Sequence, residues 1–217
     1  MPKFKVVVFD LDGTLVNTLD DIAEAANFAL AENELPPRLA SDYSKLVGNG
    51  IYKLAERATR STKQPVINKF VKDFLWYYDR NCTRSSKPYR WIPEMLEKLH
   101  AAGVRMFVVT NKPDEQAQKI IRNFFGTKIF EGVYGNKEGR KTKPDPDLVL
   151  WLLRRAGASP AESLFIGDSS VDIFTAINAG MKSAGVAWGF RSVDELRMAG
   201  ADYIFDKPDE IVSALLG

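Results

Sequence analysis

Two aspartates one residue apart follow an apolar stretch near the start of the chain. The run Val6–Phe9 is apolar, and Asp10 and Asp12 come directly after it. Two carboxylates this close repel each other, so a compensating positive charge is needed. A hard divalent cation such as Mg²⁺ prefers oxygen ligands of this kind. The pair therefore predicts a metal-assisted catalytic centre at the end of the first strand.

Three further groups of polar residues follow apolar runs later in the chain. They bring two more carboxylates, an ammonium group, a hydroxyl and an amide. Because Asp168 and Asp172 are one helical turn apart, both carboxylates can face one pocket. Four acids around one point need a cation, whereas the ammonium, hydroxyl and amide groups suit the oxygens of a phosphate. The groups are Thr110 with Asn111, Lys143, and Asp168 with Asp172.

The elements that must position these residues alternate between strand and helix from about residue 90 onward. The apolar runs do not alternate with polar residues, as expected for strands covered on both faces. This order predicts an α/β fold, a doubly wound and mainly parallel sheet with a Rossmann-like core. The carboxyl ends of such strands converge on one crevice, where the polar groups would meet. The predicted strands are Val6–Phe9, Val104–Val109, Ile129–Tyr134, Ser163–Ile166, Lys182–Val186 and Asp202–Phe205.

Four Ala-Gly pairs occur where a helix should end before the next strand. Glycine adopts the left-handed conformation at a helix C-terminus without a Cβ penalty. We interpret the pairs as helix stops rather than as a dinucleotide fingerprint, because no G-x-G-x-x-G follows a strand. Helices are predicted over Asp114–Phe125 and Asp145–Ala156. The pairs are Ala102-Gly103, Ala156-Gly157, Ala179-Gly180 and Ala199-Gly200.

Residues 17–86 interrupt the alternation of strand and helix. They are predicted to form helices with no strand between them. The simplest interpretation is an inserted helical cap of residues 17–86 on a catalytic α/β core of residues 1–16 and 87–217. The aromatic residues Phe70, Phe74 and Tyr78 recur every four residues and predict the apolar interior of this cap. The predicted helices are Asp20–Glu32, Asn49–Arg60 and Val66–Asn81.

Composition excludes several classes of protein. The 217 residues suffice for one core and a small second domain, and 45% of them are hydrophobic. A net charge of +2 argues against nucleic acid and acidic membrane surfaces as partners. No apolar run is long enough to span a bilayer. The first residues run directly into a strand, so we expect no signal peptide. A monomer or a homodimer is expected.

The chain has one cysteine and one histidine. With Cys82 alone, no intrachain disulfide can form, which fits a cytoplasmic location. His100 is predicted in the last turn of a helix, where a cation suits the helix dipole. A Ser-His-Asp mechanism and a zinc site with several histidines are therefore disfavoured. If the protein is an enzyme, carboxylates are expected to transfer its protons.

The four polar groups resemble, in order and over essentially the whole chain, the motifs of the haloacid dehalogenase-like hydrolase superfamily. The matching segments are Asp10–Leu15, Thr110-Asn111, Lys143-Pro144 and Gly167–Asp172. The resemblance implies that Asp10 is a nucleophile that forms an aspartyl-phosphate. It implies that Asp12 is the general acid and base. The dehalogenases that resemble this chain lack an acid at the second position, so Asp12 favours phosphate-ester chemistry.

The resemblance also implies the ligands of Mg²⁺ and of the phosphoryl group. The carboxylates of Asp10 and Asp168 and the backbone carbonyl of Asp12 would hold the metal, and Asp172 would lie behind them or bind through water. The substrate's phosphoryl group would be bound by three residues, of which the first and the last would also serve catalysis. These are Thr110, Asn111 and Lys143.

The segment 46–50 resembles the cap loop of phosphoglycolate phosphatases, which implies a substrate contact at Gly48 and Asn49. The alternative is that these residues only start a helix. The leading hypothesis is a Mg²⁺-dependent phosphatase that acts on a small phosphorylated metabolite, with 2-phosphoglycolate as the expected substrate. A pyrophosphatase, a nucleotidase, a sugar-phosphate phosphatase or mutase, and a phospho-accepting regulatory domain are the alternatives. Asn17 stands at the cap hinge, where many relatives have Asp.

Overall fold

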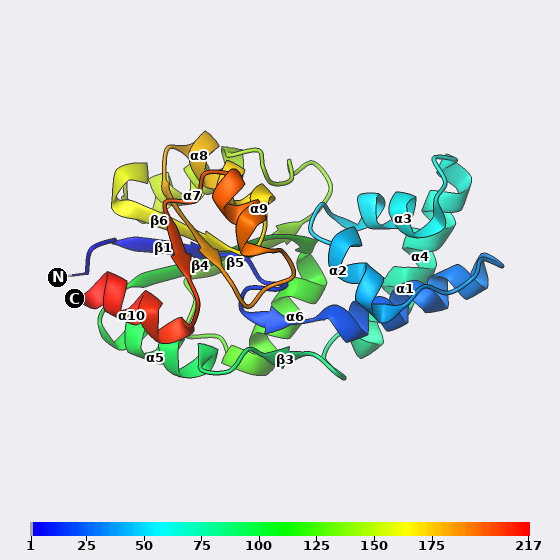
Figure 1. The fold of residues 1–217 in the computed structure, drawn as a ribbon, viewed down its shortest axis with the longest axis horizontal. Helices are drawn as coiled ribbons and strands as arrows, with labels where there is room; N and C mark the ends of the chain where they lie inside the picture. Colours follow the sequence, from blue (N-terminus) through cyan, green and yellow to red (C-terminus); the bar gives the residue numbers. More distant parts are fainter. Residues whose placement is uncertain (1) are drawn as a thin grey trace.

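The computed structural model describes residues 2–217, and within them the main sheet has six parallel strands in the order β5-β4-β1-β6-β7-β8 (Figure 1). The predicted α/β fold class is confirmed. The central strand β1 pairs with β4 on one side and with β6 on the other. The strands are β1 (Val6–Phe9), β4 (Arg105–Pro113), β5 (Gly132–Asn136), β6 (Ser163–Gly167), β7 (Lys182–Val186) and β8 (Tyr203–Phe205).

Helices cover both faces of this sheet (Figure 1). In β1, Val7 and Phe9 face the core beneath α5, α6 and α10, whereas Val6 and Val8 face α7 and α8. All four side chains are buried, which explains why the strand has no polar alternation. The elements are α5 (Ile92–Ala101), α6 (Asp114–Phe125), α7 (Asp147–Ala156), η2 (Pro160–Glu162), α8 (Ser170–Ala179), α9 (Val193–Met198) and α10 (Pro208–Leu216).

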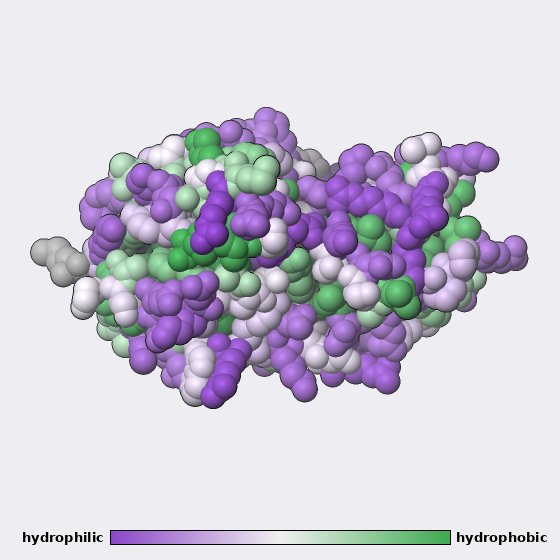
Figure 2. Space-filling view, in the orientation of Figure 1, coloured by the Kyte–Doolittle hydropathy of each residue, from purple (hydrophilic) through white to green (hydrophobic). Residues whose placement is uncertain are grey.

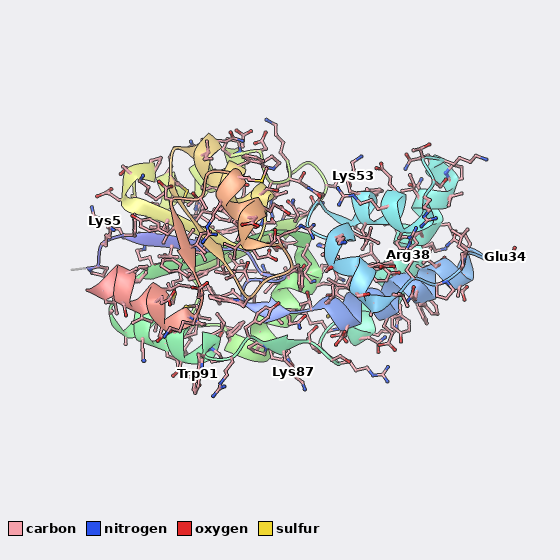
Figure 3. The ribbon with its side chains drawn as sticks, in the orientation of Figure 1. Lys5, Glu34, Arg38, Lys53, Lys87 and Trp91 are labelled. Carbon is pink, nitrogen blue, oxygen red and sulfur yellow. The ribbon has the colours of Figure 1, made fainter. Side chains whose placement is uncertain are left out.

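A helical segment lies to one side of the sheet (Figure 1). In sequence it runs from β2 to β3, two short strands that pair with each other antiparallel. Helix α1 packs on α4, and α3 packs on α4 as well. Arg38 ties the loop after α1 to the end of α3, because it donates to the carbonyls of Arg57 and Ala58 (Figure 3). The elements are β2 (Val16–Asn17), α1 (Leu19–Glu32), η1 (Ala40–Asp42), α2 (Tyr43–Leu46), α3 (Ile51–Thr59), α4 (Gln64–Asn81) and β3 (Lys87–Pro88).

The predicted element boundaries hold closely, with a few differences. Strand β4 continues through Lys112 to Pro113, beyond the predicted end at Val109, although its pairing with β5 becomes irregular there. Strand β5 starts at Gly132 rather than at Ile129. The two-residue strands β2 and β3 were not predicted, because so short a pair has no periodicity to detect. The glycines of all four Ala-Gly pairs have positive φ, as helix stops require.

Figure 2 shows polar side chains over most of one face of the molecule, with smaller apolar areas between them. Cys82 is buried as a free thiol, and His100 is exposed in the last turn of α5, as predicted. Among residues 2–217, no helix combines the length and the apolar character needed to cross a bilayer.

Candidate active site

Three buried carboxylates meet beyond the carboxyl ends of β1 and β6. Asp10 follows β1, Asp168 follows β6, and Asp172 lies in the first turn of α8. Oxygen atoms of the three carboxylates all lie within 4.8 Å of one another. Asp172 also caps α8, because one of its oxygens accepts from the backbone N–H and the hydroxyl of Ser169. Adjacent parallel strands thus bring together acids that are about 160 residues apart in the sequence.

Two glycines allow Asp168 to lie this close to the first loop. A Cβ atom at Gly13 would lie 2.2 Å from an oxygen of Asp168, and Gly13 has a φ of +79°. A Cβ atom at Gly189 would lie 2.2 Å from the Cβ of Asp168. The Phe190 N–H donates to the Asp168 carboxylate at 2.7 Å. The backbone around Asp168 therefore fits against its side chain in a way that only glycine permits at these positions.

Lys143 provides the positive charge in this cluster. Its Nζ lies 2.8 Å from Oδ1 of Asp10 and 2.6 Å from Oδ1 of Asp172. The charges of these two carboxylates raise the pKa of Lys143 above its usual range, although burial opposes them. Burial raises the pKa of Asp10 to about 6, against the attraction of Lys143. Burial and the charge of Asp172 raise the pKa of Asp168 well above its ordinary value.

The donor set fits a metal ion. Oδ1 of Asp10 is buried and has no partner in hydrogen-bond geometry, although Nζ of Lys143 is close enough to form an ion pair. Three acids face one ammonium group, so negative charge is left uncompensated; burial first, and the neighbouring carboxylates second, raise the pKa values of Asp10 and Asp168. A divalent cation with oxygen ligands would supply the missing charge.

Asp12 lies outside this triad. Its carboxylate accepts from the Thr18 hydroxyl at 2.7 Å and from Nζ of Lys112 at 2.7 and 3.0 Å. The sequence places Lys112 in the polar loop with Thr110 and Asn111, but no role was predicted for it. A lysine among the buried positions at the end of β4 was the signal that could have identified it. The side chains of Asp10 and Asp12 therefore have separate partners and can take separate roles.

Thr110 and Asn111 are buried at the end of β4. The Asn111 side chain accepts from the Lys143 backbone N–H at 2.8 Å and donates to the carbonyls of Lys143 at 3.1 Å and of Gly48 at 3.0 Å. Its amide thus links the Lys143 loop to the helical segment. Oγ1 of Thr110 accepts from the Lys112 N–H at 3.3 Å.

A small cavity of about 60 Å³ adjoins these residues. Gly48 lines it, whereas Asn49 lines an adjoining cleft. Phe74 and Tyr78 are buried among the helices, as predicted, and also border the cavity, which was not expected. The lining residues are Asp10, Asp12, Ile22, Val47, Gly48, Gly50, Ile51, Leu54, Phe74, Tyr78, Thr110, Asn111, Lys112, Pro113, Asp168, Ser169, Phe190 and Arg191.

Arg191 is a second residue that sequence analysis missed. It follows β7, and its guanidinium donates to the backbone carbonyl of Ser44 and, at 2.8 Å, to that of Val47. No motif signals this contact, because its partners are backbone groups about 145 residues away. Arg191 and Asn111 thus both hold the segment 44–48 against the residues of the sheet.

Similarity to known proteins agrees with this geometry. The chain is 33% identical over 221 residues to a phosphoglycolate phosphatase of Haemophilus influenzae, covering 98% of this chain and 99% of that protein. It is 32% identical over 215 residues to an N-acetylmuramic acid 6-phosphate phosphatase of Pseudomonas aeruginosa, covering 98% of this chain and 95% of that one. A crystal structure of a predicted phosphoglycolate phosphatase from Haemophilus somnus superposes with a TM-score of 0.91 at 33% identity, covering 98% of both chains.

The family model described as haloacid dehalogenase-like hydrolase matches residues 7–186. This range contains all four groups of polar residues that the sequence analysis singled out, from Asp10 to Asp172. The protein belongs to the haloacid dehalogenase-like hydrolase family.

Proposed function

We propose that this chain is a Mg²⁺-dependent phosphatase that hydrolyses a small phosphate monoester at the acid triad. The observation that carries the proposal is the convergence of Asp10, Asp168 and Asp172 beside the ammonium group of Lys143. Asp10, Asp168 and the backbone carbonyl of Asp12 would hold the ion, with Asp172 behind them. When bound, Mg²⁺ supplies positive charge that stabilises the charge developing on the phosphoryl group.

Asp10 is the proposed nucleophile. One of its carboxylate oxygens attacks phosphorus, the bond from phosphorus to the ester oxygen breaks, and an aspartyl-phosphate forms. Asp12 gives a proton to the departing ester oxygen. It then takes a proton from the water that attacks the aspartyl-phosphate, which releases inorganic phosphate and restores Asp10. The separate partners of the two carboxylates support this division of roles.

Three residues are proposed to bind the phosphoryl group. Lys143, which is already paired with Asp10, neutralises charge as the phosphoryl group is transferred. The hydroxyl of Thr110 and the backbone N–H of Asn111 donate to phosphoryl oxygens. Positioning and charge stabilisation of this kind carry most of phosphoryl-transfer catalysis.

We further propose that residues 17–86 form a mobile cap on a core of residues 1–16 and 87–217. The hydrogen bonds from Asn111 to Gly48 and from Arg191 to Val47 support a closed arrangement of the two parts. Closure would exclude water from the acids and complete the cavity. Asn17, in β2, stands where the chain passes from the proposed core to the proposed cap.

The preferred substrate is proposed to be 2-phosphoglycolate. Relatives of this name cover nearly the whole chain. A sugar phosphate is the second candidate, because one relative of similar identity is named N-acetylmuramic acid 6-phosphate phosphatase. We favour the smaller ester because the side chains on the helical side of the cavity are mostly apolar and would leave the hydroxyls of a sugar without partners.

The test is turnover of a panel of phosphate compounds in the presence of Mg²⁺. The panel contains 2-phosphoglycolate, pyrophosphate, a nucleoside monophosphate and a hexose phosphate. We expect 2-phosphoglycolate to give the highest kcat/KM. Preference for another ester would overturn the proposal that 2-phosphoglycolate is the substrate. Isomerisation of the hexose phosphate would favour a mutase. Asp10→Asn should abolish turnover. A long-lived aspartyl-phosphate without turnover would favour the phospho-accepting regulatory domain.

We propose that the protein is a monomer or a homodimer and lies in the cytoplasm. A monomer or a homodimer is checked by light scattering. A cytoplasmic location is checked by fractionation of the source cell.

A further inference from the structure

Lys112 places a buried ammonium group between the acids and the helical side of the cavity. Its Nζ donates to both oxygens of Asp12, at 2.7 and 3.0 Å, and its side chain is only 2% exposed. An ammonium group carries three donor hydrogens, and these contacts use two of them. The third has no acceptor among the residues that the structure describes.

The ring of Tyr78 lies beside this ammonium group, and the Tyr78 hydroxyl is a second donor without an acceptor. Nζ of Lys112 lies 4.7 Å from the centre of the Tyr78 ring. Tyr78 is 1% exposed, it lines the cavity, and its hydroxyl has no hydrogen-bond partner within residues 2–217. Buried polar groups in folded proteins are nearly always paired. The unpaired Tyr78 hydroxyl and the remaining hydrogen of Lys112, on two residues that line the same cavity, therefore indicate a missing acceptor.

The other candidates for binding an anion here are already engaged or lie elsewhere. Arg191 borders the cavity, but its guanidinium donates to the carbonyls of Ser44 and Val47. Lys45 and Arg57 line the adjoining cleft instead. Lys53 is exposed on α3 and pairs with Glu56 (Figure 3).

The rest of the helical wall is apolar. The residues that α1, α3, α4 and the loop before α3 contribute beside Tyr78 are Ile22, Val47, Ile51, Leu54 and Phe74. Because the charge of Lys112 is shared with Asp12, what remains here is two donor hydrogens, and these match a carboxylate, which accepts two hydrogen bonds. A second phosphate would bring more charge than one ammonium compensates. The hydroxyls of a sugar would face apolar residues without partners.

We propose that Lys112 and Tyr78 form the subsite that recognises a carboxylate on the organic part of the substrate. The inference rests on the proposed function, because it assigns the phosphoryl group to Asp10 and Lys143. Lys112 keeps its contact with Asp12 and gives its third hydrogen to the carboxylate, and the Tyr78 hydroxyl gives a second hydrogen bond. Both residues select the substrate rather than transfer the phosphoryl group.

The test compares two non-hydrolysable ligands by calorimetry in the presence of Mg²⁺. The first is 3-phosphonopropionate, which ends in a carboxylate, and the second is its neutral amide of the same shape. We expect the natural protein to bind the carboxylate about ten- to a hundredfold more tightly, as for hydrogen bonds to a charged group. Lys112→Met should remove most of this preference, and Tyr78→Phe should reduce the preference about tenfold. The exposed Lys72 supplies the control Lys72→Met, which should change nothing.

The outcomes separate the subsite from the proposed function. Equal binding of both ligands by the natural protein, or an equal loss of both in Lys112→Met, overturns the subsite. Circular dichroism shows whether Lys112→Met folds. If it does not, Tyr78→Phe, which keeps the ring, still tests the preference for the carboxylate over the amide. Turnover of ethyl phosphate without preference for the carboxylate overturns the subsite alone. Absence of turnover with every ester overturns both the subsite and the proposed phosphatase function.

Discussion

Nζ of Lys143 lies 2.6 Å from Oδ1 of Asp172, and both side chains are almost fully buried. The same nitrogen lies 2.8 Å from Oδ1 of Asp10. One ammonium group thus joins the loop after β1 to the first turn of α8. The ion pair is part of the structure as well as part of the proposed chemistry, which leads to the first prediction.

Lys143→Met should destabilise the metal-free protein. The substitution leaves Asp10 and Asp172 buried without a cation, and breaking a buried pair in this way costs about 3–5 kcal/mol. The free energy of unfolding in urea measures the loss, and added Mg²⁺ should restore part of it. Lys141→Met is the matched control, because Lys141 is 66% exposed and pairs only at the surface. Equal stability of the two variants would contradict the prediction.

Stability without metal should fall as the pH rises. Burial raises the pKa of Asp10 from 3.8 to about 6, and it raises the pKa of Asp168 as well. A carboxyl group with a raised pKa holds a proton in the folded protein that the unfolded chain has already released. The unfolded state therefore binds fewer protons in this range, so stability is lost between about pH 4 and pH 6 and above.

Mg²⁺ should offset this loss, because it binds the ionised carboxylates of the folded protein. We expect the increase in Tm on adding Mg²⁺ to be larger at about pH 7.5 than at about pH 5, where protons compete for the same oxygens. Differential scanning calorimetry with Mg²⁺ or with a chelator measures both values. An equal increase at the two pH values would count against a metal at these acids.

Arg191 should control how often the segment 44–48 separates from the rest of the site. Its two hydrogen bonds to the carbonyls of Ser44 and Val47 contribute about 1 kcal/mol each. Arg191→Met should therefore make opening about thirtyfold more frequent. Hydrogen exchange of the amides around Val47 reports the opening. Lys45→Met, in the same segment and without such bonds, serves as the control, and an equal effect in both variants would exclude the role of Arg191.

The sequence allowed a good prediction of the acids and of Lys143, but not of the contacts that Lys112 and Arg191 make. Asp10 and Asp168 each follow a buried apolar run, so the rule for parallel strands places them together. Lys143 was found through the order of the motifs. Arg191 was missed, and the contact of Lys112 with Asp12 was not predicted, because the partners come from distant segments and share no spacing with them.

Local backbone features were also only partly predictable. Helix ends marked by Ala-Gly pairs agree with the structure, because the signal is local. The continuation of β4 to Pro113 was not predicted, since polar residues at a strand end resemble a loop. The role of Gly13 was equally hidden, because its constraint is the side chain of Asp168, which is 155 residues away.

Gly13→Ala tests this close approach, and Gly139→Ala is its matched control. Both glycines have positive φ, +79° at Gly13 and +77° at Gly139. A Cβ atom at Gly13 would lie 2.2 Å from an oxygen of Asp168, whereas a Cβ atom at Gly139 would have no neighbour within 4 Å. Gly139→Ala should cost about 1–2 kcal/mol for the left-handed conformation alone. Gly13→Ala should cost clearly more in urea unfolding and should also raise the Mg²⁺ concentration needed for turnover, because Asp168 must move. Equal losses with unchanged dependence on Mg²⁺ would show that Gly13 serves only the turn.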